Sequence, residues 1–263
     1  MEDAKEKIIS LFFENVLGKT PDIENYDPKH SGAKGQWLEI QLGKEPDSSN
    51  DADFWGWECK NHTTSGKTTY GDWTANEYIF DKNNFFKIDR EDFLKIWGKP
   101  NEEKNGRYSW SGEHVPTYAN NENTIFGQSM YVDQDLNIVI EYNFSKDKRV
   151  NKYNIVPEHL QLENLVLAKW YGLEKYNISD KTALETKVEK KFNNKGWFKC
   201  IMEDNIYTKI VFGKTIDFDT WIHNVKKGNI FFDSGMYQGN KRPYSQWRSN
   251  NSFWDELIID VYP

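Results

Sequence analysis

The spacing of apolar residues predicts a series of short helices and strands along the chain. Within residues 4–17, Ile8, Phe12 and Val16 recur near helical spacing, and Gly18 follows as a plausible end. Further helices are predicted within residues 35–43, 90–98, 158–170, 181–192 and 216–225, and strands within 53–63, 128–144, 197–213 and 229–236. Residues 99–123 are polar and read as a loop, and residues 244–262 predict a final helix or strand.

The order of these elements predicts an α/β or α+β fold. A helix and a short helix are followed by strands, another helix and more strands, which indicates a mixed β-sheet flanked by helices. The charged turn SKDKR at residues 145–149 suggests a boundary near residue 150. We therefore expect one lobe in residues 1–150 and a second in residues 151–263.

Composition excludes several classes of protein. Hydrophobic residues make up 37% and charged residues 29% of the 263, which is typical of a globular protein. Two cysteines exclude a disulfide framework and a cysteine-rich zinc site. The N-terminal segment does not read as a signal peptide, and no stretch approaches 18 uninterrupted apolar residues, so we expect a cytoplasmic protein without a membrane segment.

Charge and aromatic content leave more than one function open. The net charge of −7 argues against a nonspecific polyanion binder, but a local basic surface can coexist with an acidic remainder. The 11 tryptophans and 16% aromatic content indicate either an aromatic core or a surface that grips nucleic acid or sugar.

The stretch DADFWGWECKNHT, residues 51–63, contains the acidic and basic residues that are candidates for catalysis. In a strand, Glu58 and Lys60 share a face while Cys59 points away, and Gly56 lets the chain turn so that Asp53 returns beside Glu58. Two converging carboxylates repel unless a cation joins them, and hard oxygen ligands suit Mg²⁺. A neighbouring lysine can then act on a phosphate oxygen or on the attacking water, which is the chemistry of phosphodiester hydrolysis.

An ordinary charged surface hairpin is the alternative interpretation of this stretch. Trp55 and Trp57 surround the acids with apolar side chains, which a surface hairpin does not need. The run from Glu185 to Lys191 is interpreted as a solvated helix face.

The segment 34–63 resembles the MutH/MvaI-like branch of the PD-(D/E)xK nucleases, which includes MvaI and BcnI. The residues that carry the resemblance are Glu39, Leu42-Gly43, Asp53-Phe54, Gly56 and Glu58-Cys59-Lys60. The interval from Asp53 to Glu58 is similar to that of the MvaI and BcnI restriction enzymes, whereas MutH-type nickases have a longer gap. Asp51 would match that longer gap but lacks the following Phe. Cys59 departs from the aliphatic residue usual there, and the C-terminal sequence is similar to that of small type II enzymes grouped with LlaMI.

This resemblance implies a restriction-endonuclease-like core with two lobes around a DNA cleft, the first lobe catalytic and the second for recognition. It implies a type II restriction endonuclease that uses Mg²⁺ to cut double-stranded DNA at a short specific sequence, leaving 5′-phosphate and 3′-hydroxyl ends. Asp53 and Glu58 would hold the metal with help from Glu39 and the backbone carbonyl of Cys59, and Lys60 would act on the water or phosphate. A cognate DNA methyltransferase encoded nearby is implied as well, and monomer and homodimer both stay open.

A basic segment, residues 234–254, is the candidate for reading DNA. It contains three basic residues and no Asp or Glu, hence a local charge of +3 in a chain of −7. Arginine can read guanine, asparagine can read adenine, and tyrosine and lysine commonly contact phosphates. The glycines and the proline in it predict a shaped loop, and a solvated basic loop is the alternative. Predicted DNA contacts are Lys241, Arg242, Tyr244, Arg248 and Asn250, with Lys67, Thr68, His62 and His223 as further candidates.

Two rival functions stay open. A MutH-like nickase for mismatch repair would use the same centre on one strand, and the short interval between Asp53 and Glu58 disfavours it. A noncatalytic DNA- or carbohydrate-binding protein would not need the intact set of Glu39, Asp53, Glu58 and Lys60.

Overall fold

The structure is a computed structural model that describes residues 3–24, 26, 32–45, 49–63, 66–82, 84–118 and 125–263. The chain forms two compact units. The first unit comprises Met1–Thr68, Lys187–Phe218 and Asn250–Pro263, and the second unit comprises Thr69–Thr186 and Asp219–Ser249. The chain thus passes between the units repeatedly and not once near residue 150. The assignment of catalysis and recognition to two lobes stays a prediction.

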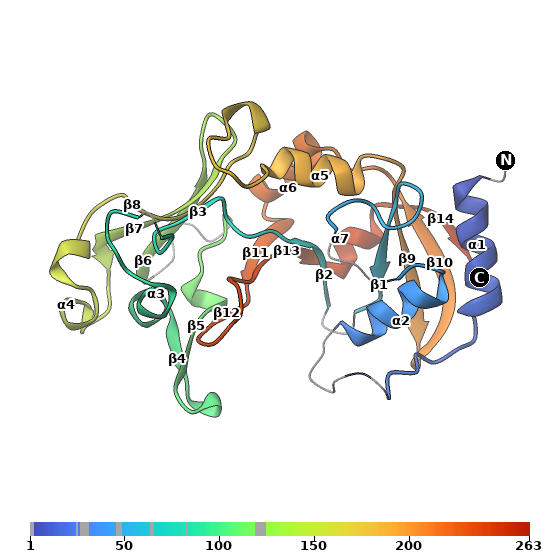
Figure 1. Cartoon of the computed structure of the whole chain (residues 1–263), viewed down its shortest axis with the longest axis horizontal. Helices are drawn as coiled ribbons and strands as arrows, with labels where there is room; N and C mark the ends of the chain where they lie inside the picture. Colours follow the sequence, from blue (N-terminus) through green and yellow to red (C-terminus); the bar gives the residue numbers. More distant parts are fainter. Residues whose placement is uncertain are drawn as a thin grey trace. The chain divides into compact units, whose positions relative to one another are not determined.

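The first unit is built on a four-stranded mixed sheet of order β1-β9-β10-β14, which confirms the predicted sheet type (Figure 1). Its strands are β1 (Trp57–Asn61), β9 (Gly196–Glu203), β10 (Ile206–Gly213) and β14 (Ile258–Tyr262). β1 runs parallel to β9, whereas β9–β10 and β10–β14 are antiparallel pairs. β1 is therefore at the edge of this sheet, and among the described residues no other strand pairs along its outer side.

Helices α1 (Ala4–Asn15) and α2 (Ala33–Gln41) supply the apolar core of this unit. Side chains such as Phe12 and Leu38 pack with Phe198 and Phe212 of the sheet. Because side chains alternate along a strand, Trp197 projects from the opposite face. Phe192 of α5 (Leu184–Phe192) and Trp254 of α7 (Asn251–Asp255) form an aromatic cluster with Trp197 on that face.

The second unit contains three small sheets, of order β3-β8-β7-β6, β11-β13-β2 and β12-β5-β4. Their strands are β2 (Lys67–Asp72), β3 (Glu77–Tyr78), β4 (Lys99–Asn101), β5 (Arg107–Trp110), β6 (Phe126–Val132), β7 (Ile138–Asp147), β8 (Leu165–Trp170), β11 (Ile230–Ser234), β12 (Met236–Tyr237) and β13 (Ser245–Asn250). The helices are α3 (Arg90–Trp97), α4 (Lys152–Ile155) and α6 (Phe218–Lys226), with short 3₁₀ turns at Glu102–Lys104, Gly112–His114, Glu158–Leu160 and Glu174–Tyr176. None of the helices in the described part of the chain has the length and apolar content of a membrane-spanning segment.

The burial of the tryptophans shows whether they belong to the core or to a binding surface. Every tryptophan except Trp55, which is 47% exposed, is buried. In the second unit Trp170, Trp221 and Trp247 pack edge-on against one another or against neighbouring aromatic rings. The tryptophans other than Trp55 therefore belong to the core, as the first of the two interpretations predicts.

Two predicted elements were wrong. Residues 158–170 were predicted as a helix, but they form a 3₁₀ turn and the strand β8, which pairs with β3 and β7 on its two sides. A short apolar run fits a buried strand and a buried helix equally well by periodicity. Residues 99–123 were predicted as a loop, but β4 and β5 lie within them, paired from Lys99↔Ser109 to Asn101↔Arg107.

Candidate active site

A tight turn folds Asp53 back onto β1. Phe54 and Trp57 exchange two backbone hydrogen bonds of 2.8 Å, and Trp55 and Gly56 between them have positive φ angles of 48° and 94°. This is the geometry of a type I′ hairpin turn. The predicted strand accordingly begins at Trp57 and not at Asp53. The backbone N–H of Cys59 donates to Oδ2 of Asp53 at 2.9 Å, so the carboxylate lies beside the free edge of β1.

Glu58 and Lys60 lie on the same face of β1, as their spacing predicts. Nζ of Lys60 donates to Oε1 of Glu58 at 2.6 Å, and the Glu58 side chain is only 2% exposed. The other oxygen, Oε2, is buried and has no hydrogen-bond partner among the described residues. Nζ of Lys60 also lies 5.1 Å from the centre of the Phe192 ring, so aromatic packing limits where the ammonium group can move.

Lys191 of α5 is a site residue that the sequence interpretation missed. Its Nζ lies 3.2 Å from Oε1 of Glu58, and its side chain is 14% exposed, which corrects the prediction that this position belongs to a solvated helix face. A usable signal was present, because Lys191 follows the buried Leu184 and Val188 by seven and three residues, which places all three on one side of a helix.

Lys44 is a second missed residue, and it helps to lower the pKa of Asp53 while the pKa of Glu58 is raised. Nζ of Lys44 donates to Oδ1 of Asp53 at 2.7 Å. Burial opposes ionisation of Asp53, but the hydrogen bonds from Lys44 and from the N–H of Cys59 outweigh it and lower its pKa. Burial raises the pKa of Glu58 to about 7, against the attraction of Lys60 and Lys191. Burial also lowers the pKa of Lys60, although Glu58 opposes this shift.

Glu39 lies on α2, half-buried and within electrostatic range of β1. Burial is the main cause that raises the pKa of the Cys59 thiol, and the nearby groups Cys200, Asp53, Glu39 and Glu58 raise it further. The charge of Glu39 thus acts on the same strand as those of Asp53 and Glu58. Its predicted role as a third acid of the site stays a prediction.

The donor set of this site fits a hard divalent cation. The N–H and C=O of one strand residue point to the same side, so the carbonyl of Cys59 faces the edge where Asp53 lies. Together with the buried, unpartnered Oε2 of Glu58, this gives oxygen donors of the kind that Mg²⁺ prefers. Within the described ranges, no three His, Cys, Asp or Glu side chains are gathered around one point. Such a site would leave several positions to water, which Mg²⁺ retains readily.

The basic segment 234–254 is mostly regular structure and not the predicted loop, since only Gly235 and residues 238–244 lie outside β11, β12, β13 and α7. Arg242 is 55% exposed and pairs with Asp72 at 2.9 Å. Arg248 is 19% exposed and pairs with Asp233 at 3.2 Å across β11 and β13. Each candidate base-reading arginine is therefore already bound to a carboxylate. Lys241 is exposed and Tyr244 is half-buried.

The remaining DNA-contact candidates differ widely in accessibility. Thr68 is 2% exposed, and its hydroxyl donates to Oδ1 of Asn251 at 2.8 Å, so it faces the protein. Lys67 is half-buried, whereas Asn250, directly before α7, and His223 on α6 are exposed. His62 is half-buried, and burial lowers its pKa. None of these roles is tested by the geometry, and all stay predictions.

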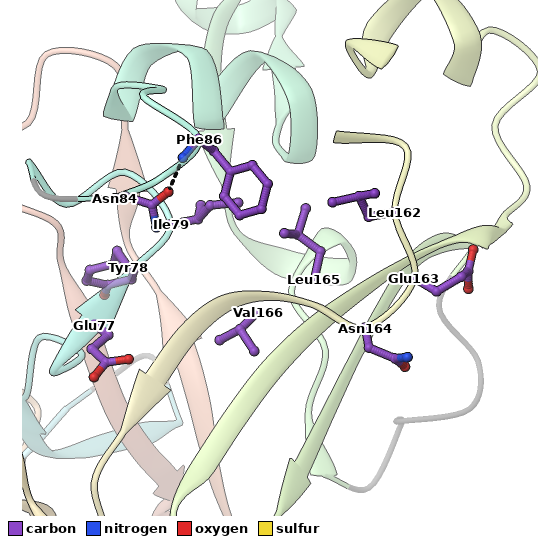
Figure 2. A pocket seen from close by; sticks show the side chains of 10 residues that line it. All are labelled: Glu77, Tyr78, Ile79, Asn84, Phe86, Leu162, Glu163, Asn164, Leu165 and Val166. Atoms are coloured by element: carbon purple, nitrogen blue, oxygen red, sulfur yellow. Dashed lines mark hydrogen bonds between the residues drawn. The ribbon is translucent and has the colours of Figure 1, made fainter. Parts of the chain in front are cut away.

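A pocket of about 340 Å³ lies in the second unit, between β3, β8 and the segment around Asn84 (Figure 2). Apolar side chains of Ile79, Phe86 and Val166 line it, together with the carboxylates of Glu77 and Glu163. No basic side chain is among the ten that line this pocket, so it does not favour a phosphate.

Comparisons with known proteins agree with one another. The family model for the LlaMI restriction endonuclease matches residues 16–262. The type II restriction enzyme ScrFI of Lactococcus lactis subsp. cremoris is 46% identical over 272 residues, which cover 100% of both chains. The solved complex of restriction endonuclease MvaI with its cognate DNA substrate superimposes with a TM-score of 0.55 at 16% identity, covering 100% of this chain and 98% of that chain, and this likeness supports the fold alone.

These matches confirm the predicted resemblance and its restriction-enzyme branch over the nickase and noncatalytic alternatives. The match extends over nearly the whole chain and includes both compact units. The chain belongs to the LlaMI restriction endonuclease family.

Proposed function

We propose that this protein is a type II restriction endonuclease that uses Mg²⁺ to hydrolyse double-stranded DNA at a short specific sequence, leaving 5′-phosphate and 3′-hydroxyl ends. The observation that carries the Mg²⁺ site is the turn at residues 53–57, which brings Asp53 to the edge of β1 beside the face with Glu58 and Lys60. We further propose that it acts in the cytoplasm and that a cognate methyltransferase protects the host DNA.

Asp53, Glu58 and the carbonyl of Cys59 would hold the cation, with Glu39 nearby to assist. When bound, Mg²⁺ neutralises charge on the scissile phosphate and lowers the pKa of a coordinated water. The N–H of Cys59 fixes the orientation of the Asp53 carboxylate, and Lys44 keeps it ionised. These two contacts orient the Asp53 carboxylate, so that it could bind a cation without a change in the backbone of β1.

Lys60 and Lys191 compensate the buried charge of Glu58 while no cation is present. As a metal ligand, Glu58 would attract these two ammonium groups less strongly. Lys60, whose pKa is lowered by burial, can then orient the attacking water or donate to a phosphate oxygen. Lys191 adds positive charge on the same face, where negative charge develops during hydrolysis.

Cleavage of a sequenced plasmid in the presence of Mg²⁺ tests this proposal. Wild-type protein should give discrete fragments, and Asp53→Ala and Lys60→Ala should give none. Asp51→Ala is the matched control, because Asp51 is the neighbouring acid with a side chain 68% exposed, and this variant should still cut. Ligation of the fragments with and without prior phosphatase treatment reports the end chemistry.

The outcomes of this experiment separate the rival functions. Loss of cutting in Asp51→Ala with retention in Asp53→Ala would transfer the metal site to Asp51. A single nick per site would favour a strand-nicking enzyme. Absence of cutting by wild-type protein on both methylated and unmethylated DNA would overturn the proposed activity.

A further inference from the structure

One arginine differs from the others in what holds its guanidinium group. The guanidinium carbon of Arg107 lies 3.6 Å from the centre of the Tyr237 ring. Within the described residues, no carboxylate forms an ion pair with Arg107. The other arginines are bound by oxygen acceptors: Arg149 by Asp147, Arg242 by Asp72, Arg248 by Asp233 and Arg90 by the carbonyl of Asn240.

A tight turn and strand pairing hold the backbone of Arg107 and of Tyr237 in place. Arg107 begins β5 directly after the left-handed residues Asn105 and Gly106, with φ of 55° and 73°. Tyr237 ends β12, which pairs with β5 in the register Tyr237↔Ser109. Gln238, directly after Tyr237, adds two hydrogen bonds between the strands. Its N–H donates to the carbonyl of Tyr108, and its Oε1 accepts from the N–H of Tyr108 at 2.7 Å.

Stacking against Tyr237 fixes the plane of the guanidinium group without using its hydrogen-bond donors. The ring of Tyr237 covers one face of the group, and the hydrogen-bond donors lie in the plane itself. Nε of Arg107 is buried without a hydrogen-bond partner among the described residues, as are the Nε atoms of Arg90 and Arg248, so the two terminal nitrogens are the donors that would meet a base. An arginine that is oriented in advance loses less conformational entropy when it binds a pair of acceptors.

We propose that Arg107, held against Tyr237, reads a guanine of the recognition sequence through the O6 and N7 acceptors of that base. This inference rests on the proposed sequence-specific cleavage of DNA. A planar fork in a fixed orientation matches the two acceptors that guanine presents in the major groove. A phosphate contact requires no such orientation, and the exposed Glu102 and Glu103 in the preceding turn disfavour a general attraction to the DNA backbone.

The experiment uses full-length protein and a short duplex that carries the site deduced from wild-type fragments. Each guanine of the site is replaced in turn by 7-deazaguanine, which keeps base pairing but lacks the N7 acceptor. Wild-type kcat/KM should fall about tenfold at one guanine. Arg107→Ala should lower kcat/KM on the unmodified duplex about 10- to 100-fold. In this variant, 7-deazaguanine at that position should cause no further fall in kcat/KM.

Three variants separate base reading from charge and from packing. Arg107→Lys keeps the charge but lacks the planar fork, so it should behave like Arg107→Ala. Tyr237→Leu removes the ring and should weaken discrimination, whereas Tyr237→Phe should preserve it. Lys104→Ala removes one positive charge from the same hairpin and should leave the 7-deazaguanine penalty unchanged.

Several results would overturn the guanine assignment. Recovery by Arg107→Lys, with equal loss on all duplexes and a salt dependence weaker by about one counterion, would indicate a phosphate contact. An unchanged 7-deazaguanine penalty in Arg107→Ala, whether or not its thermal unfolding midpoint falls, would indicate a structural role or none. Failure of wild-type protein to cut any DNA would overturn the proposed function as well, and it would be seen before any Arg107 variant is tested.

Discussion

The ammonium group of Lys191 lies 3.2 Å from Oε1 of Glu58, the same oxygen that Lys60 contacts at 2.6 Å. Two cations therefore share one buried carboxylate oxygen, while the other oxygen is left without a protein partner among the described residues. Burial of a single carboxylate is costly, and the paired lysines offset that cost. Helix α5 is thereby part of the candidate site, although it lies far from β1 in the sequence.

Lys191→Met should lower cleavage about 10- to 100-fold and move its pH profile to higher pH. The attraction of Lys191 lowers the pKa of Glu58, so its removal raises that pKa and leaves less ionised Glu58 at a given pH. Lys190→Met is the matched control, since the neighbouring Lys190 side chain is 61% exposed. A reduced rate with an unchanged pH profile would argue against this electrostatic role.

Local features of the site were predictable from the sequence because they depend on neighbouring residues. The shared face of Glu58 and Lys60 follows from the period of two in a strand, and Gly56 indicated the turn that returns Asp53. The contact of Lys191 with Glu58 depends on how α5 packs, which local spacing constrains only weakly. The strand β8 was missed for the same reason, because partners on both of its sides decide its structure.

The requirement for Mg²⁺ should depend on pH below about 7. Burial raises the pKa of Glu58 to about 7, so below this pH the carboxyl is protonated and must lose its proton before it can bind a cation. The Mg²⁺ concentration for half-maximal cleavage should rise about tenfold per pH unit below 7 and level off above it. Cleavage rates over a matrix of pH and Mg²⁺ concentration measure this, and a flat dependence from pH 6 to pH 8 would contradict it.

Asp72→Asn should strengthen nonspecific DNA binding by releasing Arg242. Arg242 is largely exposed and is held by Asp72 at 2.9 Å, and the amide oxygen of asparagine can still accept from the N–H of Ser245. We expect binding that is several-fold tighter at low salt and a salt dependence steeper by about one counterion. Fluorescence anisotropy at several salt concentrations measures both. If Arg242→Ala binds as well as wild type, Arg242 does not contact DNA.

Gly56→Ala should lower both stability and cleavage, because the turn at this position needs a glycine. Gly56 has a φ of +94°, and an added Cβ would lie 2.8 Å from the side chain of Asn194. The unfavourable backbone conformation and the contact together should cost about 1–3 kcal/mol in the free energy of unfolding. Gly35→Ala is the control, since among the described residues no atom beyond its chain neighbours and the adjacent backbone of α2 lies within 4 Å of the added Cβ there.

The double variant Gly56→Ala/Asn194→Ala separates the two causes of this loss. It removes the contact with Asn194 but keeps the strained φ, so it should recover only part of the stability in urea unfolding. Cleavage should stay low, because the strained turn no longer holds Asp53 against the N–H of Cys59 at 2.9 Å. Full recovery of cleavage with the double variant would show that the side-chain contact, and not the turn conformation, limits the position of Asp53.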